Sequence, residues 1–211
     1  MGNRERVFCY VDGYNLYRSV RGFLKTMDNP QHIWYDLIKL SREFSSENQD
    51  IARVYYCSAP YSYDRRKGKM EMPPKIRETR RAQNIFCRYH REVYGKGLFK
   101  IKFGYFRRKG SVSSPTFFQE KQTDVNLALL ALDDAHNDLY DHAFIFSGDG
   151  DFAPLAKLVL KLGKKISFIL PPGSNTSRII NNFDTRIING GHIEAAQFDP
   201  GDNAPDPQGI Y

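Results

Sequence analysis

The chain has 211 residues, 31 Lys and Arg against 24 Asp and Glu, a formal net charge of +7, and a hydrophobic share of 41%. This is enough for a buried core, and the excess of positive charge is compatible with a polyanionic partner. The three cysteines lie far apart and without paired spacing, which argues against a disulfide scaffold and a zinc site and favours reduced thiols in a cytoplasmic protein. We find no apolar segment typical of a signal peptide or a membrane span, so we expect no membrane partner.

Short apolar runs alternate with segments of helical spacing in the first half of the chain. We expect strands at residues 7–11 and 51–57, helices at 15–24 and 33–44, and a longer helix over 74–91 that opens with two prolines. Residues 98–106 alternate between apolar and basic side chains, which predicts another strand. The basic and Ser/Pro-rich stretch 107–115 is expected to form a loop.

The second half continues this alternation. We expect a helix over 124–137 with Thr123 as its N-cap, a strand ending at Phe146, a helix over about 151–162, and a strand at 165–170. Ser174 can cap a short helix, and residues 186–188 form a last short strand. We expect residues 1–198 to form a single domain and the Pro-, Gly- and Asp-rich tail 199–211 to be flexible. The alternation predicts an α/β fold with a mostly parallel sheet and helices on both faces.

Aspartates follow two of the predicted strands. Asp12 ends the first strand, and Asp149 and Asp151 follow the strand that ends at Phe146. The carboxyl ends of parallel strands share one edge of the sheet, where such proteins bind ligands. Asp124, in the first turn of the preceding helix, joins them if that helix begins at this edge. Four such carboxylates would raise one another's pKa unless a cation lay among them. Oxygen-only ligands favour Mg2+ or Mn2+, which can activate water for attack on a phosphodiester.

Each aspartate also has a structural explanation. Asp12 can belong to a turn, Asp124 is favoured by the dipole of its helix, and Asp151 is a good N-cap. Asp149 is the hardest to explain in this way, because the two residues after it already supply a turn and a cap. The joint placement of the acids at strand ends therefore favours a functional site.

Three segments together resemble a known family. They are VDGYNLY at 11–17, EKQTDVNLALL at 120–130 and SGDGDFAPL at 147–155. In this order and spacing they resemble the NYN family, the PIN-like nuclease-related domains of the LabA/DUF88 type, over most of the chain. The resemblance implies a Rossmann-like three-layer α/β/α sandwich, an acidic pocket that binds Mg2+ or Mn2+, and cleavage of phosphodiester bonds, mostly in RNA.

The resemblance also implies roles for individual residues. The implied metal ligands and catalytic acids are Asp12, Asp124, Asp149 and Asp151. Asn15 would orient a ligand or a substrate phosphate, and Ser147 would bond to the pocket. Relatives often have another aspartate six residues after the one that matches Asp124, where this chain has Leu130.

Basic side chains indicate where a nucleic acid could bind. Five arginines share one side of the predicted helix 74–91: Arg77, Arg80, Arg81, Arg88 and Arg91. Basic residues among aromatic ones suit single-stranded nucleic acid, because cations contact phosphates and rings stack on bases. Lys121 could contact a phosphate near the acids, and Arg178 belongs to a predicted helix start that could hold one. A solvated helix face explains the five arginines equally well.

The sequence thus predicts a metal-dependent nuclease, an endoribonuclease that acts on single-stranded RNA. Toprim and haloacid-dehalogenase-like domains fit poorly. The first needs a glutamate at the end of its first strand and the second needs two aspartates after it, whereas Asp12 is followed here by Gly13 and Tyr14. The non-enzymatic alternative is a nucleic-acid-binding or regulatory module that keeps the fold without cutting. A homodimer is an alternative to a monomer.

Overall fold

The centre of the molecule is a six-stranded sheet in which every neighbouring pair of strands is parallel. The structure is a computed structural model that describes residues 4–27, 34–60, 74–109, 117–173 and 177–198. The strands, in spatial order, are β3 (Phe99–Phe103), β2 (Gln49–Ser58), β1 (Glu5–Asp12), β6 (His142–Phe146), β7 (Lys165–Leu170) and β8 (Asp184–Ile187). The order reverses between β1 and β6, and open α/β sheets bind ligands at the carboxyl ends of the strands at such a reversal.

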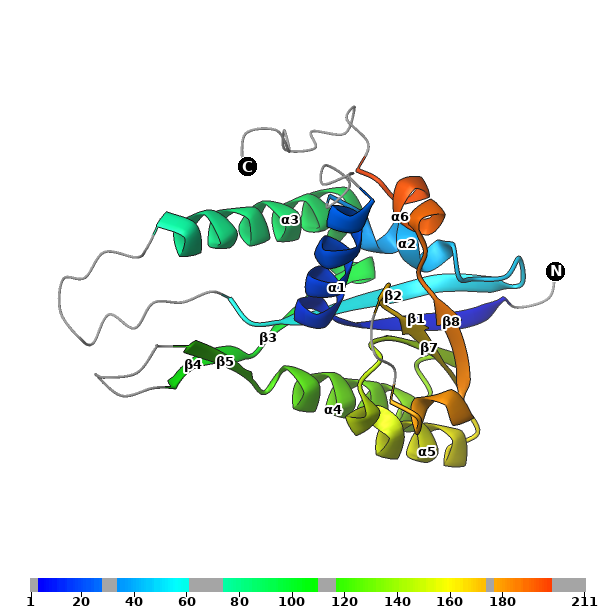
Figure 1. Ribbon diagram of the computed structural model, residues 1–211. Helices are drawn as coiled ribbons and strands as arrows, with labels where there is room; N and C mark the ends of the chain where they lie inside the picture. Colours follow the sequence, from blue (N-terminus) through cyan, green and yellow to red (C-terminus); the bar gives the residue numbers. More distant parts are fainter. Residues whose placement is uncertain (1–3, 28–33, 61–73, 110–116, 174–176, 199–211) are drawn as a thin grey trace.

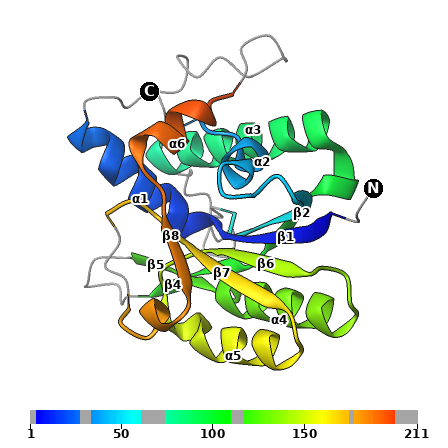
Figure 2. The ribbon, with the colours of Figure 1, turned by 90° about the vertical axis from the view of Figure 1, so that its right-hand side faces the viewer.

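Helices cover both faces of this sheet (Figure 2). One face packs against α1 (Gly13–Thr26), α2 (Leu37–Arg42), α3 (Pro74–Leu98) and α6 (Gly190–Ala195), and the other against α4 (Thr123–His136) and α5 (Ala153–Lys161). Alternate residues of β1 enter the two cores: Val7, Cys9 and Val11 lie in the first, Phe8 and Tyr10 in the second. Burial on both faces explains the continuously apolar strands. The predicted Rossmann-like three-layer α/β/α sandwich is confirmed.

A small antiparallel hairpin stands apart from the main sheet. It consists of β4 (Tyr105–Lys109) and β5 (Phe117–Lys121), and it extends on the same side of the molecule as the N-terminal part of α3 (Figure 1). The single predicted strand over 98–106 is therefore wrong, because the chain changes sheets at Gly104. A Cβ atom there would lie 2.3 Å from the carbonyl oxygen of Lys121 and 2.9 Å from Oγ1 of Thr123. The predicted loop over 107–115 is wrong in its first three residues, which belong to β4.

Several predicted boundaries also change. The helix expected over 33–44 covers only Leu37–Arg42, because Asp36 caps it through bonds to two backbone N–H groups and Tyr35 pairs with Gln197. The helix expected over 74–91 continues to Leu98 with a break at Gly95, where φ is 67°. The last strand covers 184–187, and neither β5 nor α6 was predicted. The predicted cap at Ser174 and the tail 199–211 lie outside the described residues.

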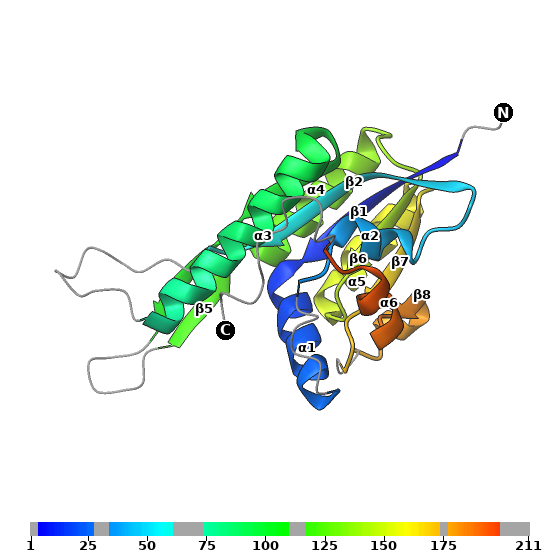
Figure 3. The same cartoon turned by 90° about the horizontal axis from the view of Figure 1, so that it is seen from above.

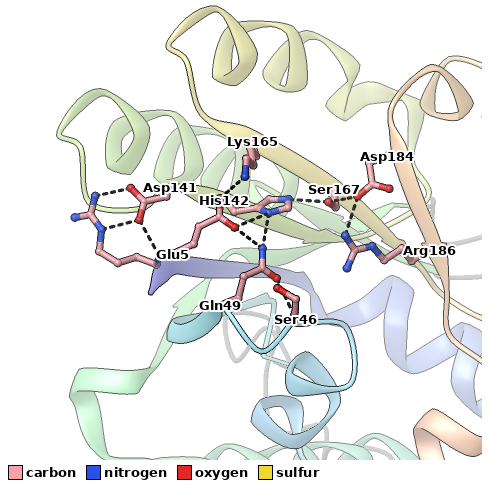
Figure 4. A network of polar contacts seen from close by, with 10 residues as sticks. Glu5, Ser46, Gln49, Asp141, His142, Lys165, Ser167, Asp184 and Arg186 are labelled. Atoms are coloured by element: carbon pink, nitrogen blue, oxygen red, sulfur yellow. Dashed lines mark hydrogen bonds and ion pairs between the residues drawn. The ribbon is translucent and has the colours of Figure 1, made fainter. Parts of the chain in front are cut away.

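A polar network links the strands near their amino ends (Figure 4). Asp12 lies at the opposite, carboxyl end of β1. Nδ1 of His142 lies 3.0 Å from Nε2 of Gln49, and Nε2 of His142 lies 2.7 Å from Oγ of Ser167. The network continues to Glu5 on one side and to Asp184 on the other. It thus connects β2, β1, β6, β7 and β8 in their spatial order.

Among the described residues, none of the helices combines the length and the hydropathy that a membrane-spanning helix needs.

Candidate acidic site

Asp12 is the last residue of β1 and also the N-cap of α1. Its side chain is buried, and it accepts hydrogen bonds from Nδ2 of Asn15 (2.5 Å), the backbone N of Asn15 (3.3 Å) and Oγ of Ser147 (3.3 Å). The turn into α1 needs a glycine, since a Cβ atom on Gly13 would lie 2.3 Å from the ring of Tyr56. The two hydrogen bonds from Asn15 hold the carboxylate of Asp12 in place.

The SGDGD segment leaves β6 beside the end of β1. Ser147 is buried, and its Oγ accepts the backbone N–H of Asp149 (3.2 Å) while it donates to Asp12. Asp149 caps a short 3-10 turn, η3 (Gly150–Phe152), by accepting the N–H of Asp151 (2.9 Å). The expectation that Asp151 is the cap is therefore wrong. Asp149 makes the cap, and the side chain of Asp151 is exposed.

Asp124 lies in the first turn of α4, which follows the hairpin. The N-cap position is Gln122, whose backbone is left-handed (φ 70°) and whose side chain makes no capping bond. The predicted cap, Thr123, is instead the first helical residue and is buried, close to the point where Gly104 passes. The hairpin thus brings the start of α4 to the carboxyl edge of the sheet, which was the condition for Asp124 to join the other acids.

Asp124 lies close enough to each of the other three aspartates for their charges to interact. Burial, and then repulsion from Asp124, raises the pKa of Asp12 to about 6, although the hydrogen bonds from Asn15 and Ser147 act in the opposite direction. Burial, and then repulsion from Asp149 and Asp151, raises the pKa of Asp124. Clusters of carboxylates with raised pKa values in partly buried positions are typical of functional sites.

The donor chemistry of this cluster fits a hard divalent cation. All of the side chains offer oxygen atoms, and a cation among them would offset the repulsion that raises the pKa values. Within the described ranges, no three acidic, histidine or cysteine side chains lie close enough to share one ion directly. Mg2+ usually keeps several of its water ligands and needs only one or two direct carboxylates, so the cluster fits an ion held partly through water.

The basic residues singled out in the sequence divide into two groups. Lys121 ends β5, and Arg178 directly follows Ser177, whose N–H lies 3.4 Å from the carbonyl oxygen of Gly148 in the SGDGD segment. Both therefore belong to segments beside the acids. Arg77 and Arg81 are exposed on α3, which packs on the sheet face opposite to α4.

Leu130, at the position where relatives often carry an aspartate, does not take part in the cluster. It packs against the core between the sheet and α4 and α5. Of the two acids farther along α4, Asp134 is buried and accepts a hydrogen bond from the hydroxyl of Tyr10 (2.7 Å). Asp134 therefore has a structural partner on β1 and does not replace the missing acid.

Sequence reasoning overlooked the basic side of α1. The guanidinium carbon of Arg18 lies 5.5 Å from the ring centre of Tyr14, and that of Arg21 lies 6.0 Å from the ring centre of Tyr17. The ring of Phe106 on β4 meets the ring of Tyr14 edge-on, with the centres 6.0 Å apart. Helical spacing of the basic residues within 13–26 was the signal that could have found this surface.

Comparisons with known proteins agree with the fold and the motifs. The model of the NYN domain matches residues 6–190. The crystal structure of a protein of unknown function from Vibrio parahaemolyticus RIMD 2210633 is similar with a TM-score of 0.54 and 18% sequence identity, over 90% of this chain and 96% of that one. This likeness supports the fold alone. No curated protein matches the chain. The family match covers most of the chain, so this protein belongs to the NYN domain family, a group within the PIN-like nuclease superfamily whose members act on nucleic acids.

Proposed function

We propose that this protein is a metal-dependent endoribonuclease that hydrolyses phosphodiester bonds of single-stranded RNA. Mg2+ or Mn2+ would be held by Asp12, Asp124, Asp149 and Asp151, in part through bound water molecules. The observation that carries the proposal is the gathering of these carboxylates at the reversal of strand order, where burial, and then repulsion from neighbouring aspartates, raises the pKa values of Asp12 and Asp124. We propose further that residues 1–198 act as one domain and that the protein works in the cytoplasm.

The residues around the cluster have separable tasks in this proposal. Asn15 and Ser147 hold the carboxylate of Asp12 in one orientation, and Asp149 is fixed by its bond to the N–H of Asp151. A bound ion would polarise a phosphoryl oxygen and lower the pKa of a water molecule. Ordered carboxylates make that position reproducible, which is what an in-line attack on phosphorus requires.

Positive charge beside the acids would hold the substrate. Lys121 and Arg178 are proposed to contact phosphates next to the cleaved bond, because their segments border the SGDGD segment and the start of α4. Arg77 and Arg81 are proposed to contact the nucleic acid farther from the cleaved bond, since α3 lies on the other face of the sheet from α4. Phosphate contacts of this kind position the chain without reading its sequence.

The test is cleavage of a labelled single-stranded RNA with Mn2+, with Mg2+ and with EDTA. Asp149→Asn is the informative variant, because asparagine caps a helix as well as aspartate does and so keeps the bond to the N–H of Asp151. Asp50→Asn, an exposed residue in β2, is the matched control. We expect metal-dependent cleavage that falls by about 100-fold or more in Asp149→Asn and stays unchanged in Asp50→Asn. RNA binding without cleavage by the wild type in either metal would instead support a binding module.

A further inference from the structure

Helix α1 carries a basic stripe that begins at the acidic site. Asp12 caps this helix, and Tyr14, Arg18, Arg21 and Lys25 follow at spacings of four, three and four residues, so they share one side. Arg18, Arg21 and Lys25 are exposed. The 14 residues of α1 include these three basic side chains and no acidic one. We call Arg18, Arg21 and Lys25 the α1 stripe.

Two of the three charges of the α1 stripe are restricted by aromatic rings, and none of the three has an acidic partner among the described residues. Arg18 lies over the ring of Tyr14 and Arg21 over the ring of Tyr17, which restricts both guanidinium groups without cancelling their charge. Across the described part of the chain, no acidic side chain lies within ion-pair distance of any of the three. Ordered cations without an acidic partner are suited to an external anion.

The arginine side of α3 is a weaker candidate for the same role. Arg88 there pairs with Glu92 (3.9 Å), and Glu78 is also exposed on this helix. Figure 3 shows that α1 leaves the sheet directly at the carboxyl end of β1, where Asp12 lies. The α1 stripe therefore begins six residues after Asp12, about 9 Å along the helix axis, whereas the arginines of α3 belong to a helix that begins elsewhere in the chain.

We infer that α1 is the path along which the backbone of a single-stranded RNA leaves the acidic site, with successive phosphates on Arg18, Arg21 and Lys25. Neighbouring members of the stripe are about one helical turn, about 5.4 Å, apart along the axis, close to the separation of phosphates in an extended strand. A narrow row of cations beside aromatic rings suits one strand. The inference rests on the proposed function for what happens at the acids, but the binding itself needs no metal.

The test measures binding of a labelled single-stranded oligouridine in EDTA at several salt concentrations. The variant is Arg18→Gln/Arg21→Gln, and the matched control is Lys157→Gln/Lys161→Gln, which removes two exposed cations from α5. We expect the α1 variant to bind roughly 10-fold more weakly at 0.1 M salt, with a log–log salt slope smaller by about 0.7 for each lost contact. The control should bind like the wild type. Both variants should show wild-type circular dichroism and melting, because all four side chains are exposed.

Two results would overturn the inference. One is an Arg18→Gln/Arg21→Gln variant that keeps the RNA affinity and the salt slope of the wild type. This result would count most if Arg77→Gln/Arg81→Gln on α3 lowered both quantities. The other is tighter binding of a duplex of the same length than of the single strand. Because binding is measured without metal, a protein that never cleaves RNA but loses affinity in the α1 variant keeps this inference and loses the nuclease proposal. Normal cleavage and normal RNA binding by the α1 variant would keep the nuclease proposal and overturn this inference.

Discussion

Ser147, the residue that follows β6, donates a hydrogen bond to the carboxylate of Asp12 on β1, across the point where the order of the strands reverses. The same oxygen accepts the backbone N–H of Asp149. One buried hydroxyl, 135 residues from Asp12 in the chain, therefore connects two of the proposed metal ligands, Asp12 and Asp149. The geometry of the acidic site depends on this bond as well as on the sheet.

We predict that Ser147→Ala impairs the site more than it impairs folding. It leaves the partly buried N–H of Asp149 without its acceptor, which costs about 1 kcal/mol of unfolding free energy. It also removes one of the three hydrogen bonds that orient Asp12, so we expect cleavage to fall about 10- to 100-fold at a temperature where the variant is fully folded. Urea unfolding and RNA cleavage measure the two effects. Ser45→Ala, which removes a bond to the carbonyl oxygen of Arg42, is the control. Full activity in Ser147→Ala would show that this bond has no part in the site.

The raised pKa of Asp12 predicts that its charge destabilises the fold when no metal is present. The pKa of Asp12 is about 6 in the folded chain and 3.8 for an ordinary aspartate. Because the folded chain favours the protonated carboxyl group, the contribution of Asp12 to the free energy of unfolding is complete below pH 3.8 and is lost as the pH rises through 6. The loss corresponds to about 3 kcal/mol at pH 8, and part of it should be recovered in Asp12→Asn. We expect this variant to melt a few degrees higher than the wild type at pH 8 in EDTA.

Divalent ions give the complementary measurement. Mn2+ should raise the melting temperature of the wild type, since it would bind the folded chain only, and should have little effect on Asp12→Asn. If Asp12→Asn is less stable than the wild type in EDTA, the charge of Asp12 does not destabilise the fold and the electrostatic explanation is contradicted. Equal stabilisation of both proteins by Mn2+ would argue against Asp12 as a ligand.

His90 should make the protein sensitive to acid. It is fully buried on α3, its Nε2 accepts the N–H of Leu37 (2.9 Å), and its Nδ1 faces the carbonyl oxygen of Phe86 (2.8 Å), so the ring is neutral with its proton on Nδ1. Burial lowers its pKa to about 4, against the opposing effects of Asp36 and Phe86. A lowered pKa means that the neutral form is favoured in the folded state. The contribution of His90 to the free energy of unfolding is therefore complete above pH 6.5 and is lost as the pH falls toward 4.

Urea unfolding at pH 7, 5.5 and 4.5 measures this effect. Between pH 7 and 4.5 the wild type should lose up to about 3 kcal/mol that His90→Asn does not lose. The variant should also be less stable at pH 7, because the N–H of Leu37 loses a well-placed acceptor. His136→Gln, at an exposed position on α4, should follow the wild type. Parallel pH curves for the wild type and His90→Asn would refute the prediction.

Gly150 should be required for the segment that carries Arg178. A Cβ atom on Gly150 would lie 2.5 Å from Oγ and 2.9 Å from Cβ of Ser177, so Gly150→Ala must displace the chain just before Arg178. We expect lower stability and weaker RNA binding. Ser177→Gly should relieve the clash, with a coupling of about 0.5–3 kcal/mol in a double-mutant cycle. Additive effects of the two changes at positions 150 and 177 would contradict direct contact.

Gly22→Ala on α1, where the added methyl group meets nothing within 4 Å, should stabilise the helix by about 0.5–1 kcal/mol.

The sequence predicted the central strands well because each carries its own signal. Residues 7–11, 51–57, 142–146 and 165–170 are apolar runs that need burial on both faces, and the structure places all four in one parallel sheet. The predicted acids at the strand ends follow from the same pattern, because parallel strands bring their carboxyl ends to one edge. Local pattern therefore gave the sheet, the edge and the residue types of the candidate site.

Contacts between distant segments decided the rest. Asp149 and Asp151 are both reasonable caps by sequence, and only the bond between Ser147 and Asp12 and the turn that follows select Asp149. Gly104 divides one alternating run between two sheets because the start of α4 passes too close for a side chain. The raised pKa of Asp12 and the absence of acidic partners for the α1 stripe among the described residues likewise depend on which residues are neighbours in space. Such quantities depend on through-space distances that only the folded chain defines, whereas periodicity along the sequence defines which face of an element is buried.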